Sequence, residues 1–291
     1  MNKLNVFCFG FGQVAENFVK KLKAEKIPFQ LTTTSREETR SKNFEDINYQ
    51  SFHFDEKKFD INLIKHLEEA DHILISIAPI NGDDIVIKNF KTNFNDKKYQ
   101  WITYLSATSV YGNHDGEWVD EKSKTNPTSK QGIHRLKAEQ SWIKLAKNNN
   151  LPLQIFRLSG IYSNQHNVLK RLETGVAKII KKKNHFFSRI HVEDIANVLF
   201  KSLKNFKERE IYNISDDKPC SSEEVTIYGA KILNLSLPKK IDIIDIESEM
   251  LKNFYKDSKK VSNKKMKYFF NYNLKFPTYI EGLDNIRNNI I

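Results

Sequence analysis

Short apolar runs alternate with amphipathic stretches along the first half of the chain. The apolar runs predict strands, and they are Leu4 to Phe9, Phe29 to Thr33, His72 to Ala78, Trp101 to Leu105 and Leu153 to Leu158. Stretches with helical spacing lie between them, at about 14–25, 60–69, 84–92 and 130–149. Strands that are apolar on both faces and separated by amphipathic helices are typical of a parallel sheet covered on both sides. The pattern therefore predicts an α/β fold with a doubly wound parallel sheet.

After Leu158 the pattern changes to shorter elements. It predicts strands at Arg189 to His191 and Ile211 to Ile214, and helices at 166–181, 192–204, 222–233, 246–255 and 278–288. We therefore expect the chain to form two parts. A large α/β domain comprises residues 1–163 and is completed by 189–219, and a smaller, mostly helical C-terminal lobe comprises 164–188 and 220–291.

The turn after the first predicted strand is rich in glycine. Gly10 to Ala15 has the pattern G-x-G-x-x-A between an apolar strand and the start of a helix. In this context the first glycine permits the sharp turn, the second leaves room for a pyrophosphate, and the small third residue lets helix and strand approach closely. The alternative is a glycine turn that merely joins a strand to a helix. Its place at the first strand of an alternating chain favours a dinucleotide site in a Rossmann fold, with the anion at the helix N-terminus.

The end of the second strand bears on which dinucleotide binds. A site that prefers NAD places an acid there for the ribose hydroxyls, whereas here Thr32 to Ser35 is followed by Arg36. A hydroxyl and a guanidinium suit the 2′-phosphate of NADP. The alternative is that Arg36 only pairs with Glu37 or Glu38. We expect NADP, with NAD as the less favoured cofactor, bound by Gly10, Phe11, Gly12, Gln13, Val14, Ser35, Arg36, Ala78, Pro79 and Ser106.

The charge of the chain first suggests a nucleic-acid partner. The 291 residues include 47 Lys and Arg against 36 Asp and Glu, a net charge of +11. The lysines are scattered among acids, however, and only Lys181 to Lys183 is locally dense, so we expect a solvated basic surface and no nucleic-acid partner. Two distant cysteines offer no disulfide framework, and no apolar segment is long enough to span a membrane. We therefore expect a cytoplasmic protein without a membrane partner.

Tyr104 to Gly112, with the sequence YLSATSVYG, resembles the strand and turn of the extended and atypical short-chain dehydrogenase/reductases, the epimerase/dehydratase-like group. Further similar segments follow in the order of that family, and they are Val119 to Glu121, Arg157 to Tyr162, Arg189 to Ala196, Tyr212 to Pro219, Val261 to Asn263 and Phe276 to Tyr279. The resemblance implies hydride transfer at a nicotinamide. It also implies a tyrosine as acid and base, a lysine four residues later that holds the ribose, and a serine or threonine that polarises the substrate.

The chain departs from the family at each of these three positions. Counting from the Val-Tyr-Gly turn puts Ala107 at the serine or threonine position. Counting back from Glu139 on the next helix puts Arg135 at the lysine position and Gln131 at the tyrosine position. A glutamine amide cannot donate and recover a proton as a phenol does, and a guanidinium binds anions without relaying protons.

Other side chains are candidates for the missing acid or base. His134 lies three residues after Gln131, on roughly the same helix face, and imidazole titrates near neutrality. Thr108 and Tyr111 follow the strand Trp101 to Leu105, and Tyr162 follows the strand Leu153 to Leu158. For each of them, a solvated or packed side chain with a satisfied polar group is the alternative. The expected catalytic residues are Thr108, Tyr111, His134 and Arg135.

Two residues of the Arg189 to Ala196 segment are further candidates for a site. His191 has no second ligand at metal-binding spacing, so no metal site is expected. Arg189 either faces a substrate cleft, as the resemblance implies, or makes a surface salt bridge.

Two functions remain open at this point. The first is an NAD(P)-dependent, epimerase/dehydratase-like oxidoreductase or isomerase that acts on a small polar molecule bound by the C-terminal lobe. The second is a catalytically inactive NADP-binding sensor or regulatory protein, since the tyrosine and lysine are replaced. The resemblance also implies a homodimer formed through the helix at 130–149.

Overall fold

The computed structural model describes residues 3–95 and 99–289, which fold into two compact units. Unit 1 comprises Met1–Ala107, Ile133–Arg157 and Ile195–Tyr212, and unit 2 comprises Thr108–Gly132, Leu158–Asp194 and Asn213–Ile291. The expected division into a cofactor-binding domain and a substrate lobe concerns what each part binds, and it stays a prediction.

Unit 1 contains most of an eight-stranded, mostly parallel sheet. Its strands lie in the order β12 (Ile211–Ile214), β8 (Leu153–Leu158), β6 (Trp101–Ala107), β5 (His72–Ile75), β1 (Leu4–Phe9), β2 (Phe29–Ser35), β4 (Ile47–His53) and β3 (Arg40–Phe44). Strand β1 pairs in parallel with β2 on one side and β5 on the other, so the strand order reverses there. Ligands of doubly wound sheets bind outside the carboxyl ends of the strands at such a reversal. The predicted fold class is confirmed.

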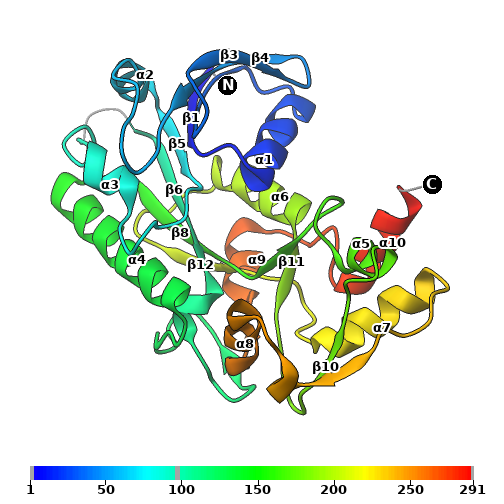
Figure 1. Ribbon diagram of the computed structural model, residues 1–291. Helices are drawn as coiled ribbons and strands as arrows, with labels where there is room; N and C mark the ends of the chain where they lie inside the picture. The colour runs from blue at the N-terminus through cyan, green and yellow to red at the C-terminus, as the bar shows by residue number, and fades with distance from the viewer. Residues whose placement is uncertain (1–2, 96–98, 290–291) are drawn as a thin grey trace. The chain divides into compact units, whose positions relative to one another are not determined.

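Helices cover both faces of this sheet (Figure 1). Helices α2 (Leu63–Glu69), α3 (Ile85–Phe90) and α4 (Lys130–Asn149) contribute to one large apolar core, in which Trp142 is fully buried. Helices α1 (Gln13–Ala24) and α6 (Val192–Ser202) cover the other face, where the ring of Phe18 stacks on Trp101 at 5.6 Å. The indole nitrogen of Trp101 donates to Ser202 Oγ at 2.9 Å and so ties α6 to β6.

The antiparallel hairpin of β3 and β4 at the edge of the sheet was not predicted (Figure 1). Its two-residue turn, Glu45 and Asp46, has positive φ angles of 49° and 63°, which is typical of a type I′ hairpin turn. Arg40 to Asn43 is polar, because an edge strand buries little of either face. The apolar pattern therefore carries no signal for it.

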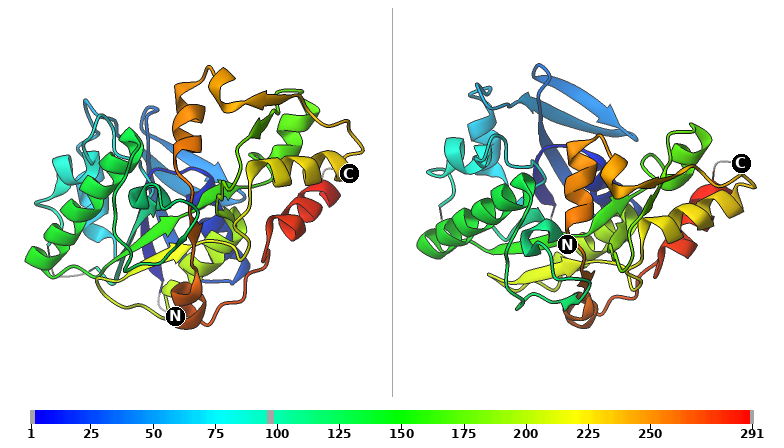
Figure 2. Two further views of the ribbon diagram at one scale, coloured as in Figure 1. Left: turned by 90° about the horizontal axis from the view of Figure 1, so that it is seen from below. Right: turned by 60° about the horizontal axis from the view of Figure 1, so that its bottom comes forward.

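Unit 2 is built from short parallel strand pairs and helices. The pairs are β9 (Gly160–Tyr162) with β11 (Arg189–His191), β10 (Ile179–Lys181) with β13 (Lys240–Asp242), and β7 (Trp118–Val119) with β14 (Lys260–Val261). The helices are α5 (Val168–Glu173), α7 (Ser222–Ile232), α8 (Glu249–Lys256), α9 (Lys264–Phe270) and α10 (Tyr279–Asn288), with single 3-10 turns at η1 (Thr108–Tyr111) and η2 (Ile243–Asp245). In both views of Figure 2, α7 runs beside α5 and α10.

One predicted element of unit 2 is wrong. The helix expected over 166–181 ends at Glu173, and Gly175 follows with a φ angle of 70°. Ile179–Lys181 then forms β10, because it pairs with the distant segment Lys240–Asp242. Helix α9 was not predicted.

The dense lysine run has partners in unit 2. Lys181 Nζ lies 3.9 Å from Asp242 Oδ1, and Lys182 Nζ donates to the carbonyl of Tyr255. Within residues 3–95 and 99–289, no helix is long and apolar enough to cross a bilayer.

Candidate cofactor and substrate sites

Gly10 makes the sharp turn at the end of β1. Its φ angle is 82°, and a Cβ atom there would lie 2.9 Å from Ser76 Oγ and 3.0 Å from Ile77 Cγ1. Its N–H donates to Thr34 Oγ1 at 2.9 Å, while Ser76 Oγ donates to the carbonyl of Phe9 at 3.0 Å. The turn is thus fixed by the ends of both strands that flank β1, β2 and β5.

Gly12 is the N-cap of α1, and it leaves the space before the helix open. It has no side-chain cap, and a Cβ atom there would meet nothing within 4 Å. The N–H groups of a helix's first turn have no acceptor within the helix and attract anions. Ala15 is fully buried where α1 approaches the sheet. These residues fit the pyrophosphate of a dinucleotide, as the spacing predicts.

The end of β2 carries the residues expected at the adenosine ribose. Ser35 Oγ accepts from Ser51 Oγ at 3.3 Å. Arg36 is exposed and makes no hydrogen bond or ion pair with any residue that the structure describes. The carboxylate of Glu37 is instead bound by Arg40 Nη2 at 2.5 Å and Lys42 Nζ at 2.8 Å. The alternative in which Arg36 pairs with Glu37 or Glu38 is therefore not seen.

The remaining expected cofactor residues lie after β5 and near the end of β6. Ala78 is exposed and Pro79 half-buried in the segment that follows β5. Ser106 is 2% exposed, and its Oγ has no hydrogen-bond partner among the described residues. Phe11 and Gln13, in the glycine turn, are half-buried.

Arg135 on α4 is held against the end of β6. Its Nη1 donates to the carbonyl of Leu105 at 2.5 Å and lies 3.5 Å from Tyr104 Oη. Burial raises the pKa of Tyr104, and the nearby guanidinium opposes that rise. Nε and Nη2 of Arg135 have no acceptor in the described part of the chain, so they remain able to bind a ribose hydroxyl or an anion. Gln131, one turn earlier, is exposed.

His134 lies against the loop between β5 and α3. Its Nε2 is 3.3 Å from the position that a Cβ of Gly82 would take. The ring is half-buried and forms no hydrogen bond to a described residue. Asp84, at the end of this loop, caps α3 and accepts from Trp142 Nε1 at 2.8 Å, and burial raises its pKa.

Thr108 and Tyr111 belong to unit 2 and form η1. Thr108 is 8% exposed, and Tyr111 is fully buried with its hydroxyl donating to Asn213 Oδ1 at 2.7 Å. The backbone N–H of Asn213 donates to Glu121 Oε1 at 2.7 Å, and its side-chain amide donates to the carbonyl of Ser262 at 3.3 Å. Three of the segments that carried the resemblance thus meet at Asn213 and hold one another.

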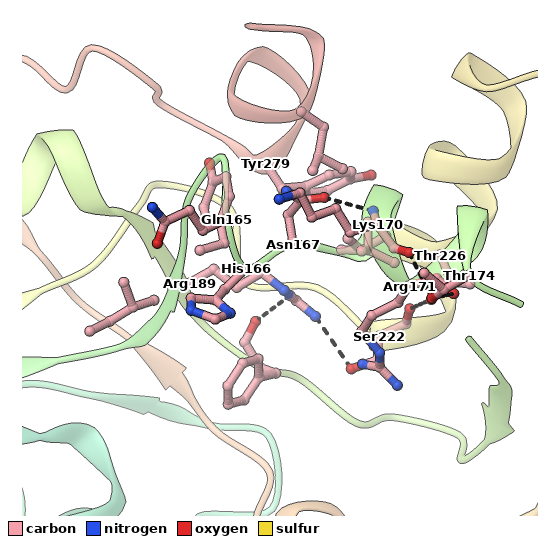
Figure 3. A pocket seen from close by; sticks show the side chains of 16 residues that line it. Gln165, His166, Asn167, Lys170, Arg171, Thr174, Arg189, Ser222, Thr226 and Tyr279 are labelled. Carbon is pink, nitrogen blue, oxygen red and sulfur yellow. Dashed lines mark hydrogen bonds between the residues drawn. The ribbon is translucent and has the colours of Figure 1, made fainter. Parts of the chain in front are cut away.

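Unit 2 contains a pocket of about 450 Å³ beside α5, α7 and α10 (Figure 3). Polar and basic side chains line it, among them Gln165, His166, Asn167, Lys170, Arg171 and Arg189. None of the described residues that line it is an Asp or a Glu. Of the residues that line it, the sequence pointed to Arg189 and Tyr162 and not to Lys170 and Arg171, because the latter two look like ordinary exposed helix residues.

Arg189 lies almost buried in this pocket with neutral hydrogen-bond partners. Its Nη1 donates to the carbonyl of Phe187 at 2.9 Å, and its Nη2 donates to Ser222 Oγ at 3.3 Å (Figure 3). Nη1 also donates to the carbonyl of Cys220 at 3.2 Å. Burial raises the pKa of nearby Asp216 to about 8, although the guanidinium opposes this rise. Arg189 forms no ion pair with a described carboxylate, although Asp216 and Glu224 lie close enough to interact with its charge. A buried cation with such partners favours an anion in the pocket.

A mostly parallel sheet whose order reverses beside a G-x-G-x-x-A turn defines a Rossmann-like α/β fold. Known proteins then identify the family. The NAD dependent epimerase/dehydratase family matches residues 94–215. A functionally unknown conserved protein from Silicibacter pomeroyi DSS is 31% identical, with a TM-score of 0.86 and 99% of each chain covered. The chain belongs to the NAD dependent epimerase/dehydratase family, as its sequence segments predict.

Two further solved structures share the fold at lower identity. UDP-glucuronic acid 4-epimerase from Bacillus cereus, in complex with UDP-glucuronic acid and NAD, is 16% identical, with a TM-score of 0.77 and 99% of each chain covered. dTDP-glucose 4,6-dehydratase from Bacillus anthracis str. Ames, in complex with NAD, is 17% identical, with a TM-score of 0.76 over 98% of this chain and 96% of that chain. Among the curated proteins, none matches the chain.

Proposed function

We propose that the protein binds NADP and acts as an oxidoreductase or isomerase on a small anionic molecule. The observation that carries this proposal is the glycine turn at the strand reversal. Gly10 admits no side chain, and Gly12 leaves open space at the start of α1. That pair of properties suits a pyrophosphate and is not required by a turn that only connects two elements.

NADP is proposed over NAD because of the charges after β2. Arg36 is exposed and free to bind a 2′-phosphate, and the nearest carboxylate in sequence, Glu37, is engaged by two cations. A ribose with free 2′- and 3′-hydroxyls needs a carboxylate acceptor that is not already occupied. The NAD seen in the two enzymes of the same fold belongs to those proteins, so NADH is the essential comparison in every binding experiment.

The catalytic roles follow from which side chains have free polar groups. When bound, a nicotinamide donates or accepts a hydride. Arg135 holds the ribose or a substrate anion through Nε and Nη2, since Nη1 is committed to Leu105. Among the proton donors, His134 is favoured because its ring has no hydrogen bond to a described residue, whereas the Tyr111 hydroxyl is committed to Asn213. Thr108, which is nearly buried, is proposed to orient the substrate.

The substrate is proposed to carry a carboxylate or phosphate bound by Arg189. The pocket in unit 2 holds this guanidinium among neutral partners, with Lys170 and Arg171 on α5 at its wall. The epimerase of the same fold binds UDP-glucuronic acid, an acid that contains both kinds of anion. Nucleotide sugars with an acidic sugar are therefore the first substrates to test.

A binding protein without catalysis is the second proposal. It is favoured by the replacement of the family's tyrosine and lysine by Gln131 and Arg135 and by the Tyr111 hydroxyl, which is held by Asn213. In that case NADPH occupancy would report the redox state to a partner.

Turnover separates the two proposals. The protein is incubated with NADP⁺ or NADPH and a panel of acidic nucleotide sugars, sugar phosphates and carbonyl acids, and product is followed by NMR and NADPH fluorescence. The enzyme proposal expects product with at least one substrate, a rate that falls about tenfold or more in His134→Ala, and an apparent KM that rises in Arg189→Gln. Cofactor binding without product across the panel favours the binding protein.

We also propose a cytoplasmic homodimer that forms through α4. Ile133 and Ile143 on this helix are 50% and 41% exposed, an apolar face that a second copy would cover. Light scattering measures the mass directly, and Ile143→Lys is expected to convert a dimer to a monomer. A wild-type protein that is monomeric at all concentrations tested would contradict the proposed homodimer.

A further inference from the structure

The β3–β4 hairpin packs against the glycine turn. The ring of Phe11 lies 5.4 Å from the ring of Phe44 and 5.1 Å from that of Tyr49. The hairpin's own turn is tied to α1, because Lys20 Nζ lies 2.7 Å from Glu45 Oε1 and Lys23 Nζ donates to the Glu45 carbonyl. The hairpin is therefore fixed at both ends beside the place where the cofactor's phosphates are proposed to bind.

The face of the hairpin that meets the glycine turn also carries two cations. Residues directly opposite in an antiparallel pair share a face, and the register pairs Lys42 with Tyr49 and Arg40 with Ser51. Since Tyr49 contacts Phe11, both Lys42 and Arg40 lie on that face. Ser51 on the same face is hydrogen-bonded to Ser35 at the end of β2, one residue before Arg36.

The carboxylate of Glu37 already binds both of these cations. Glu37 Oε2 accepts from both Arg40 and Lys42, and these hydrogen bonds hold the pKa of Glu37 below its usual range. The three side chains are 59%, 62% and 22% exposed, in the order Glu37, Arg40 and Lys42. Exposed ion pairs of this kind contribute little to stability. A phosphate has three strong acceptor oxygens and close to two negative charges, so it competes well with one carboxylate.

We propose that Arg40 and Lys42 form, together with Arg36, the binding site for the 2′-phosphate of NADP, and that Glu37 holds the two hairpin cations in place until the phosphate displaces it. This inference rests on the proposed cofactor but goes further. It assigns the specificity to a hairpin that the sequence pattern did not predict, and it gives Glu37 a competing role. The opposite role, in which the Glu37 carboxylate binds free ribose hydroxyls and favours NAD, predicts the reverse effect of removing it.

Two small probes test the assignment without any turnover. 2′,5′-ADP and 5′-ADP share the adenosine and differ in whether a phosphate stands on the 2′-oxygen, and their dissociation constants are measured by calorimetry. For the wild-type protein, 2′,5′-ADP is expected to bind about tenfold or more tightly than 5′-ADP, equivalent to about 1.4 kcal/mol. Raising the salt concentration is expected to shrink this ratio, because the sites are exposed.

Variants separate the roles of the three side chains. Arg40→Gln and Lys42→Gln are each expected to weaken 2′,5′-ADP binding about threefold to tenfold and leave 5′-ADP unchanged. Glu37→Gln is expected to strengthen 2′,5′-ADP binding by a few-fold, which a merely structural side chain would not do. Lys65→Gln, at an exposed lysine on α2 whose side chain is 79% exposed, is the control and changes neither constant.

The outcomes distinguish this inference from the proposal on which it rests. If Arg36→Gln abolishes the preference for 2′,5′-ADP while Arg40→Gln, Lys42→Gln and Glu37→Gln leave it unchanged, the hairpin assignment is wrong and the NADP proposal stands. If Glu37→Gln weakens 5′-ADP binding instead, Glu37 serves the ribose hydroxyls and the inference is overturned. If the wild-type protein binds both probes equally, the inference and the NADP preference both fail.

Discussion

Arg157 on β8 and Glu139 on α4 form a buried, bidentate ion pair. Arg157 Nη2 lies 2.7 Å from Glu139 Oε2 and Nε lies 3.1 Å from Oε1, with only 5% and 1% of the two side chains exposed. The pair fixes both the position and the rotation of α4 on the sheet. Arg135 lies one turn before Glu139 on the same helix, where it contacts the end of β6.

Removing one member of the pair is expected to destabilise unit 1 strongly. Glu139→Gln leaves a buried guanidinium without a counter-charge, which costs about 3–5 kcal/mol. Urea denaturation followed by circular dichroism measures the loss. Lys137→Gln on the same helix breaks only an exposed pair with Asp83 and should change stability by less than about 1 kcal/mol. Equal losses in the two variants would contradict a structural role for the buried pair.

Alanine at Gly10 is expected to lower stability, whereas alanine at Gly12 is expected to weaken cofactor binding. Gly10→Ala places a methyl group 2.9 Å from Ser76 Oγ in a left-handed backbone, so it lowers the melting temperature. Gly12→Ala meets no atom of the protein, so it leaves the melting temperature nearly unchanged. Its methyl group fills the space proposed for the pyrophosphate, and NADPH affinity should fall about tenfold or more, equivalent to about 1.4 kcal/mol. Unchanged NADPH affinity in Gly12→Ala would remove the glycine turn from the binding site.

Acid is expected to destabilise unit 2 through His191. Burial lowers the pKa of His191 to about 4 from its ordinary 6.5, and Nδ1 accepts from the N–H of Glu193 at 3.3 Å. The unfolded chain gains a proton below pH 6.5 while the folded chain resists it, so stability is present above that pH and is lost as the pH falls toward 4.

Two histidine variants separate the contribution of His191 to the loss of stability in acid from the contribution of the carboxylates. His191→Asn keeps an acceptor for the Glu193 N–H but does not titrate, so its stability should fall less steeply than that of the wild type between pH 6.5 and 4.5. His166→Asn, at an exposed ring, should follow the wild-type curve. Parallel curves for the wild type and His191→Asn would show that His191 is not the titrating group.

Tyr111→Phe tests whether the hydroxyl of Tyr111 stabilises the fold or takes part in catalysis. Loss of its hydrogen bond leaves the buried Oδ1 of Asn213 without this donor and is expected to cost about 1–3 kcal/mol of stability. NADPH affinity should stay within about twofold of the wild type, because the hydroxyl already has a partner inside unit 2. A variant of full stability that has lost turnover would instead make Tyr111 the proton donor.

The sequence predicted the central strands because burial on both faces leaves a predominantly apolar run, as in Leu4–Phe9 and Leu153–Leu158. It missed the β3–β4 hairpin because Arg40 to Phe44 is held by pairing with β4 and by the contact of Phe44 with Phe11, not by local apolar spacing. The helix predicted over 166–181 was too long, because pairing of Ile179–Lys181 with the distant segment Lys240–Asp242 overrides local preference.

The candidate sites likewise include parts that could be predicted from the sequence and parts that could not. The glycine turn was readable because each glycine has a local backbone or contact requirement. The hydrogen-bond partners of Arg189 could not be predicted from the sequence, because Cys220 and Ser222, which accept from its guanidinium, lie on a distant segment of the chain. The same holds for Glu37, whose engagement by Arg40 and Lys42 depends on the hairpin.

The central claim is that the glycine turn and the residue after β2 bind NADP. Titration of the wild-type protein with NADPH and NADH, followed by nicotinamide fluorescence, tests it most directly, with Gly12→Ala and Arg36→Ala alongside. The account predicts that NADPH binds about tenfold or more tightly than NADH, that Arg36→Ala removes this difference, and that Gly12→Ala weakens both. Equal weak binding of NADPH and NADH that neither substitution changes would contradict it.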